Sequence, residues 1–75
     1  EDNPVSFTDI VDGVITLPAE PEGFVAGKFL LLLNSNGTDG FYQIEAIAGF
    51  TLTLVEKTVN ATTGEIYSAP SIIRI

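Results

Sequence analysis

The sequence contains no cysteine and no histidine. Without cysteine, disulfide bonds and thiolate metal sites are both excluded. Without histidine, the chain lacks the commonest transition-metal ligand and the commonest general base. No apolar run approaches the ~20 residues that cross a bilayer. We therefore expect neither a cofactor nor a membrane-spanning segment.

Basic side chains are scarce as well. Three basic residues stand against ten acidic ones, which gives a formal net charge of −7 at pH 7. Lys28, Lys57 and Arg74 are scattered along the sequence and form no basic stripe. Phosphate backbones and anionic lipid surfaces repel such a chain. We therefore expect no nucleic-acid partner and no membrane partner.

Catalytic chemistry lacks its usual residues. Ser6, Ser35, Ser68 and Ser71 have no histidine base, and no lysine stands at a spacing typical of a serine nucleophile. Carboxylates are abundant, but a glycosidase needs two of them about 5–10 Å apart across a cleft, for which a small barrel has little room. A solvated acidic surface that keeps the protein soluble explains them better. We expect no enzyme activity.

The 75 residues suffice for one domain, and we place a polar arm at residues 1–4 and a single β-barrel domain at residues 5–75. A chain this short buries only about 60% of the surface that it exposes unfolded. Its hydrophobic content is nevertheless 45% and its mean hydropathy +0.36. Since small folds often gain support by oligomerisation, we expect a homo-oligomer. The sequence begins with Glu1 and not with methionine, so we expect this end to be trimmed or processed, or the chain to be a piece excised from a longer protein.

Short stretches of apolar residues are separated by turn residues, and none shows a sustained helical period, although one turn of helix would fit residues 55–59. The pattern predicts an all-β fold: a small antiparallel β-barrel or sandwich, SH3-like or Ig-like, with about six to seven short strands. The expected strands are 5–10, 13–17, 28–33, 41–48, 51–55, a short edge strand at 66–67, and 71–75 with Ile73 and Ile75 inward.

Three local signals add detail to this pattern. The dipeptide Asp12-Gly13 predicts a hairpin turn. Gly49-Phe50 predicts a corner between two strands. Between them, the alternation of apolar and polar residues slips near Glu45–Ala46, which predicts a β-bulge that bends the strand.

The run Phe29–Leu33 is apolar at every position. A strand with one wet face should alternate, so either the fold covers both faces of this strand or a partner covers one. Leu31 and Leu33 would form an apolar seam on one of the faces. Most aromatic residues must pack in so small a core, but Phe41 and Phe50 each stand at a turn and are the best candidates for exposure.

The loop 34–40 loosely matches a calcium loop. Asn34, Asn36, Thr38 and Glu45 take its positions one, three, five and twelve, but position six is Asp39 instead of glycine and the flanks are strands. Turn composition explains every residue here, since glycine takes positive φ and asparagine or aspartate bonds its own backbone. We predict a hairpin loop without a metal ion.

The segment Phe24 to Leu54 carries F-x-x-G-K-F-L-L-L, then N-G-T-D-G-F-Y-Q-I-E-A-I, then T-L-T-L. In this order the motifs resemble a small β-barrel module of tailed-bacteriophage virion structural proteins: capsid decoration (cement) proteins, connectors, tails and fibres. The resemblance implies a non-enzymatic structural role in the virion, which is assembled in the host cytoplasm. It implies as partners copies of the chain itself and other virion proteins, such as a major capsid protein.

A virion component of this kind would hold its neighbours through its arm, its stiff proline-rich loop and its apolar strand. The alternative is a tail-fibre or other extracellular β module that binds glycans or proteins. A third hypothesis is an enzyme inhibitor that presents the loop Pro18–Gly23. The residues expected to contact partners are Asp2, Asn3, Pro4, Val5, Glu20, Pro21, Glu22, Leu31 and Leu33.

Overall fold

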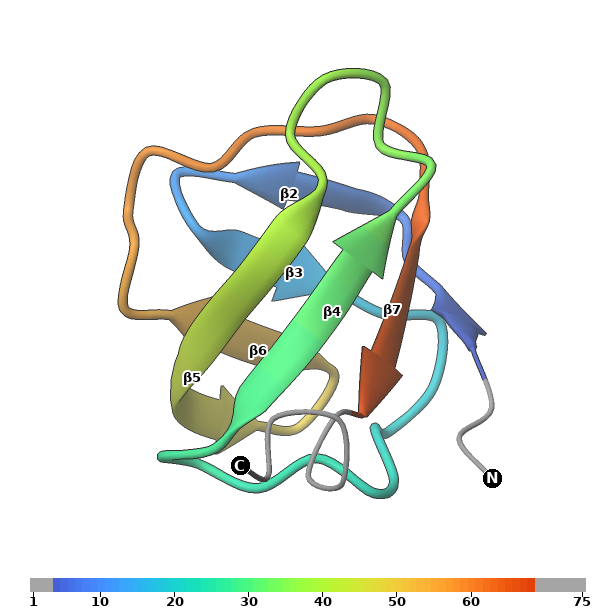
Figure 1. The fold of residues 1–75 in the computed structure, drawn as a ribbon. Coiled ribbons are helices and arrows are strands. Elements are labelled where there is room, and N and C mark those ends of the chain that lie inside the picture. Colours follow the sequence, from blue (N-terminus) through green and yellow to red (C-terminus); the bar gives the residue numbers. More distant parts are fainter. Residues whose placement is uncertain (1–3, 69–75) are drawn as a thin grey trace.

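Seven short antiparallel strands form one curled sheet in the computed structural model, which describes residues 4–68 (Figure 1). Their order across the sheet is β1-β7-β4-β5-β6-β3-β2. No helix occurs in this part of the chain, so no helical turn forms at residues 55–59. The predicted all-β antiparallel class is confirmed. The strands are β1 (Val5–Ser6), β2 (Asp9–Val11), β3 (Val14–Thr16), β4 (Phe29–Leu33), β5 (Gly40–Ala48), β6 (Thr51–Leu54) and β7 (Glu65–Ser68).

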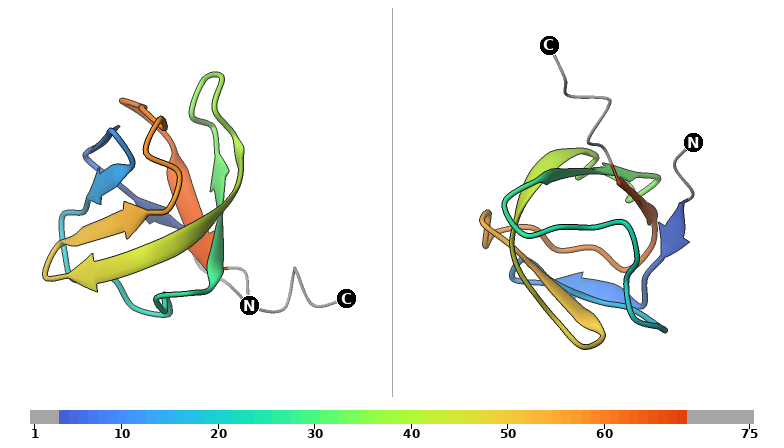
Figure 2. Two further views of the ribbon diagram at one scale, coloured as in Figure 1. Left: turned by 90° about the vertical axis from the view of Figure 1, so that its left-hand side faces the viewer. Right: turned by 90° about the horizontal axis from the view of Figure 1, so that it is seen from below.

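The bend in β5 gives the sheet its curl. The first half of β5 pairs with β4 and its second half with β6. The register shifts between Ile44 and Ala46, so the bulge predicted near Glu45–Ala46 is confirmed. An extra residue bends the bulged strand and increases its twist. Figure 2 shows β5 curving from one side of the molecule to the other.

The segment 5–10, predicted as one strand, is divided in two. β1 pairs with β7, β2 pairs with β3, and the buried Phe7 lies between them. Since β1 and β2 are the two outer strands of the sheet, the chain leaves one edge at Ser6 and joins the other at Asp9. One straight strand cannot pair at both edges, so the break at Phe7 is what brings the edges of the sheet together.

Both predicted tight turns are confirmed. Asp12 and Gly13 have φ values of 51° and 80°, and positive φ at both central residues is the mark of a type I′ hairpin. This turn joins β2 to β3. Gly49, with φ of 58°, and Phe50 turn the chain from β5 into β6.

The core lies inside the curl. In β4, Leu30 and Leu32 are fully buried, whereas Phe29, Leu31 and Leu33 are only half-buried. The unbroken apolar run therefore belongs to a strand with a covered inner face and an outer face that stays partly exposed. The largest fully buried side chains are Ile10, Ile15, Leu30, Leu32, Ile44, Leu52, Leu54 and Ile66.

The prediction of a short edge strand at 66–67 is wrong, because β7 is longer and lies inside the sheet. It runs over Glu65–Ser68 and lies between β1 and β4, with a ladder on each side. Ile66 fills the core at 0% exposure. The sequence gives no sign of the β1 ladder, because two residues of β1 are too few to show a pattern. The strand predicted at 71–75, with Ile73 and Ile75, lies outside the described residues.

Candidate interaction surfaces

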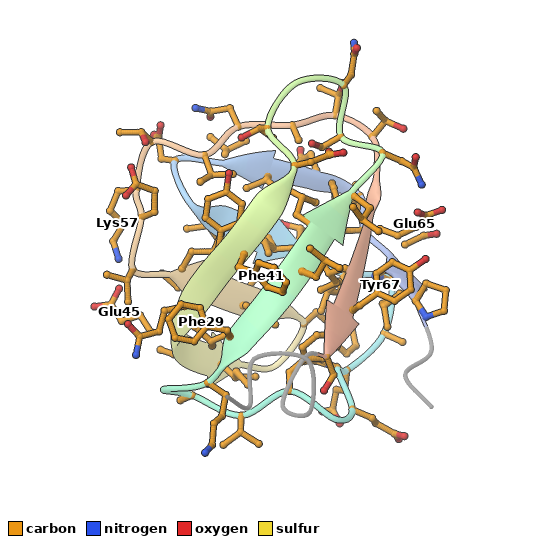
Figure 3. All side chains as sticks on the ribbon, in the orientation of Figure 1. Phe29, Phe41, Glu45, Lys57, Glu65 and Tyr67 are labelled. Atoms are coloured by element: carbon orange, nitrogen blue, oxygen red, sulfur yellow. The ribbon has the colours of Figure 1, made fainter. Side chains whose placement is uncertain are left out.

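A row of three apolar side chains crosses the outside of the sheet from β5 to β7. Leu31 lies opposite Phe41 on one side and opposite Tyr67 on the other. Residues two apart on a strand share a face, so Phe29 and Leu33 extend the row along β4. Phe41 is 47% exposed and the others are half-buried. Figure 3 shows the labelled aromatics of this set on one side of the sheet. We call Phe29, Leu31, Leu33, Phe41 and Tyr67 the outer apolar face.

Polar side chains surround this face. Asn34 Nδ2 donates a hydrogen bond to Glu65 Oε1 at 2.7 Å. On the opposite side Lys57 forms an ion pair with Glu45, and its Nζ also donates to the Leu54 carbonyl at 2.7 Å. Figure 3 shows Glu65 on one flank of the face and the pair of Lys57 and Glu45 on the opposite flank. An apolar centre with a polar rim is the usual composition of a protein–protein interface.

An open groove of about 380 Å³ separates β5 from the segment 55–59. The groove begins where β5 and β6 part: Val55 N–H donates to the Gln43 carbonyl at 2.9 Å, and beyond this bond the chain turns away towards Gly13. Tyr42 stands in the groove, and its hydroxyl donates to the Thr38 carbonyl at 2.7 Å. The lining residues are Thr38, Phe41, Tyr42, Gln43, Val55, Glu56, Thr58 and Val59.

Asp39 organises the loop 34–40. Its carboxylate accepts hydrogen bonds from the backbone N–H of Ser35 at 2.9 Å and of Asn34 at 3.3 Å, and from the Ser35 hydroxyl. These hydrogen bonds hold the pKa of Asp39 below its usual range. The bond from the Ser35 side chain has the largest effect, and the backbone bonds add to it. A carboxylate that accepts several hydrogen bonds stays ionised more readily. The predicted hairpin loop, with Asp39 bonding its own backbone, is confirmed.

The four residues that match a calcium loop are not brought together. The Asn34 amide bonds Glu65, and Glu45 lies in β5, where it pairs with Lys57. Within residues 4–68, no group of three or more Asp, Glu, His or Cys side chains is placed to hold a metal ion.

The residues expected to contact partners fall in separate places. Asp2 and Asn3 lie outside the described residues, and Pro4 is exposed. Val5 belongs to β1, opposite Ile66, and packs against the core. In the loop, the side chains of Glu20 and Glu22 are exposed and that of Pro21 is half-buried.

Only Leu31 and Leu33 of the expected set belong to the outer apolar face. Phe41, expected to be exposed, joins them, and Phe50 is exposed at 53% but sits at the β5–β6 turn. Sequence reasoning missed Phe29 and Tyr67. The alternation of β4 would have found Phe29, whereas Tyr67 joins the face only through the β4–β7 register.

Comparison of the chain with protein-family models, curated proteins and solved structures gave no match. Residues 4–68 contain no helix of the length and apolarity that crossing a membrane requires.

Proposed function

We propose that this chain is a non-enzymatic virion structural protein, a capsid decoration or cement protein of a tailed bacteriophage, which associates with copies of itself. The outer apolar face carries the proposal. Five apolar side chains from three strands lie there side by side, with Phe41 half in solvent. Contiguous apolar patches on small soluble proteins commonly mark interaction sites.

Energetics favour covering this face. Burial of apolar surface contributes about 25 cal/mol per Å², and a core of this size leaves limited stability of its own. Two copies each carry a formal charge of −7, so Coulomb repulsion opposes their contact. Dissolved salt screens the repulsion between solvent-exposed charges. Self-association through the outer apolar face should therefore strengthen as salt concentration rises.

Attachment to the particle would use other parts of the chain. The loop residues Glu20 and Glu22 are exposed and do not belong to the outer apolar face. The arm residues Asp2, Asn3 and Pro4 precede β1 in the sequence. Both groups are our candidates for contact with a major capsid protein. Many weak contacts from linked copies add up through effective concentration, so each contact can be small. The protein would then reside in the virion, after assembly in the host cytoplasm.

Co-sedimentation with tailed-phage capsids tests this function. The parent chain should bind capsids and Leu31→Lys should bind them less well, because loss of self-association removes avidity. Val11→Lys, on an exposed residue of β2, is the matched control and should bind like the parent. A parent chain that neither self-associates nor binds capsids would overturn the proposal.

A second candidate is a tail-fibre or extracellular β module that binds glycans. The groove favours it, because Phe41 and Tyr42 stand there beside the polar side chains of Gln43, Glu56 and Thr58. Sugar binding combines aromatic surface with a few directed polar groups. Phe41→Ala should abolish binding on a glycan array, whereas Phe50→Ala, outside the groove, should leave it intact. An array without hits for the parent would remove this candidate.

A further inference from the structure

Within residues 4–68, part of β5 has a backbone edge without a partner. In an antiparallel ladder, the N–H and C=O groups of successive residues point to opposite neighbours. Ile44 N–H donates to the Lys28 carbonyl at 2.8 Å, so Ile44 faces the β4 side. Gln43 faces the other way, and its carbonyl accepts the Val55 N–H. Phe41, two residues before Gln43, must face the same way as Gln43.

Three backbone groups consequently point into the groove. They are the N–H and C=O of Phe41 and the N–H of Gln43, and no hydrogen bond joins any of them to another group of residues 4–68. Unpaired groups of this kind on a strand edge are a template for an added strand. The segment 55–59 lies on the other side of the groove and does not occupy the position of an added strand.

The far wall of the groove is fixed in position. Gly13 N–H donates to the Val59 carbonyl at 2.9 Å, and the Gly13 carbonyl accepts from Leu54 N–H at 2.7 Å. Asp12 N–H adds a bond to Asn60 Oδ1 at 2.9 Å. The β2–β3 turn therefore holds both ends of the segment 55–59 away from β5. A groove built in this way is present before a ligand arrives, which lowers the entropy lost on binding.

We propose that this groove binds a short, extended, basic peptide segment of a partner protein, which adds to β5 as a strand beside Phe41 and Gln43. Main-chain hydrogen bonds supply affinity in strand addition, and alternate side chains supply specificity. One set of ligand side chains would lie beside Phe41 and the other set towards Tyr42 and Val59. The proposal does not depend on the virion assignment.

Charge selects the occupant. Glu56 lines the groove, whereas the nearby Lys57 is engaged by Glu45 and by the Leu54 carbonyl. A second copy of this chain would bring a formal charge of −7 against that wall. A basic segment gains from the same field, and complementary potentials favour both its encounter and its register. Because the carboxylate of Glu56 stands in the groove wall itself, the groove favours a basic segment of a different protein over a second copy of this chain.

Amide exchange measured by NMR on the labelled 8.0 kDa chain tests the free edge directly. Without ligand, the amide of Phe41 should exchange at least about 100-fold faster than that of Ile44. The Ile44 N–H donates to the Lys28 carbonyl, whereas the Phe41 N–H has no acceptor within residues 4–68. Equal protection of the two amides in the free protein would overturn the proposal, since it would mean that the edge is already paired.

The probe is the acetylated, amidated peptide Lys-Val-Lys-Val-Lys-Val, which alternates basic and apolar residues. At saturation it should slow exchange at Phe41 and Gln43 by at least about tenfold, as a cross-strand bond requires. The same peptide with N-methyl groups on alternate amides keeps its charge but loses donors, and it should bind at least about tenfold more weakly. Equal binding of the two peptides, or binding elsewhere on the chain, would contradict strand addition.

Two charge-reversal variants complete the test. Glu56→Lys should weaken binding of the peptide by at least about tenfold, whereas Glu22→Lys, the same change in the exposed loop, should leave it within about twofold. Added NaCl should weaken this binding, although it should strengthen self-association. The two proposals can therefore fail separately. Binding that is indifferent to Glu56→Lys, or a groove that takes only glycans, would overturn the peptide site.

Discussion

Leu31 of β4 and Phe41 of β5 lie directly opposite each other on the outside of the sheet. Ile44 N–H donates to the carbonyl of Lys28, the residue that precedes β4, so by alternation along β5 the pair of Leu31 and Phe41 is not hydrogen-bonded. Side chains come closest in such pairs. Contacts of this kind contribute roughly 0.2–1 kcal/mol. The pair joins β4 to β5 and at the same time presents an apolar surface to solvent.

Adjacent leucines of β4 should respond very differently to truncation. Leu30→Ala should lower the free energy of unfolding by about 2–5 kcal/mol, because it leaves a cavity in the core. Leu31→Ala should lower it by less than about 1.5 kcal/mol, since its side chain is only half-buried. Urea unfolding of the two variants measures both values. Equal losses would show that the outer face is packed as tightly as the core.

Gly13→Ala should destabilise the protein by more than its backbone conformation alone explains. A Cβ at this position would lie 2.6 Å from the Glu56 carbonyl oxygen and 3.0 Å from Lys57 Cα. Gly49→Ala is the control, because Gly49 also has positive φ but nothing lies within 4 Å. Gly49→Ala should cost about 1–2 kcal/mol, and Gly13→Ala about 1–3 kcal/mol more because of the clash.

Thermal and urea unfolding compare the two glycine variants. A Gly13→Ala protein as stable as the Gly49→Ala control would mean that the segment 55–59 yields easily. The groove beside β5 would then not be held open by the β2–β3 turn.

Asp39 should make the protein less stable in acid. Its pKa in the folded state lies below the ordinary value of 3.8, chiefly because the Ser35 side chain donates to it. A lowered pKa contributes stability that is fully present above the unfolded value and is lost as pH falls through the folded value. The stability difference between the parent and Asp39→Asn should therefore be constant near neutral pH and shrink below pH 3.8.

The cause of this shift can be tested separately. Ser35→Ala should raise the pKa of Asp39. An NMR titration of the Asp39 carboxyl carbon measures this pKa. Thr51→Ala, which removes a hydroxyl bonded to the Ala48 carbonyl in another turn, should leave that pKa where it is. A pKa of Asp39 that Ser35→Ala does not move would refute the assignment of the cause.

The ion pair of Glu45 and Lys57 should contribute little to stability. The side chains of Glu45 and Lys57 are 53% and 51% exposed. Exposed ion pairs typically contribute about 0.2–1 kcal/mol, and salt weakens them further. A double-mutant cycle with Glu45→Gln and Lys57→Met should give a coupling free energy below about 1 kcal/mol. A coupling well above this would indicate a pair that solvent does not screen.

Local patterns predicted the elements of this fold better than its long-range pairings. The two tight turns and the β-bulge were predicted correctly because such features depend on a few neighbouring residues. Their signals were Asp12-Gly13, Gly49-Phe50 and the slip near Glu45–Ala46. The position of β7 between β1 and β4, and the break at Phe7, depend on distant partners: β7 pairs with β1 from about 60 residues away and with β4 from more than 30 residues away in the chain. Period and turn chemistry carry no information on such pairings.

The candidate surfaces follow the same division. Leu31, Leu33 and Phe41 were singled out from their own strands, as an apolar run and as a residue after a turn. Tyr67 joined them only when the register was known. The groove was missed altogether, because it arises where β5 and β6 part and where the chain reaches across to Gly13. That separation is a property of the assembled sheet.

The central claim is that the outer apolar face joins copies of this chain. Light scattering after size exclusion, at about 100 µM in physiological salt, measures the native mass of the parent and of Leu31→Lys. The claim predicts a multiple of the 8.0 kDa chain mass for the parent and a folded 8.0 kDa monomer for the variant. A parent that elutes as an 8.0 kDa monomer, or a variant with the same oligomeric mass as the parent, would contradict it.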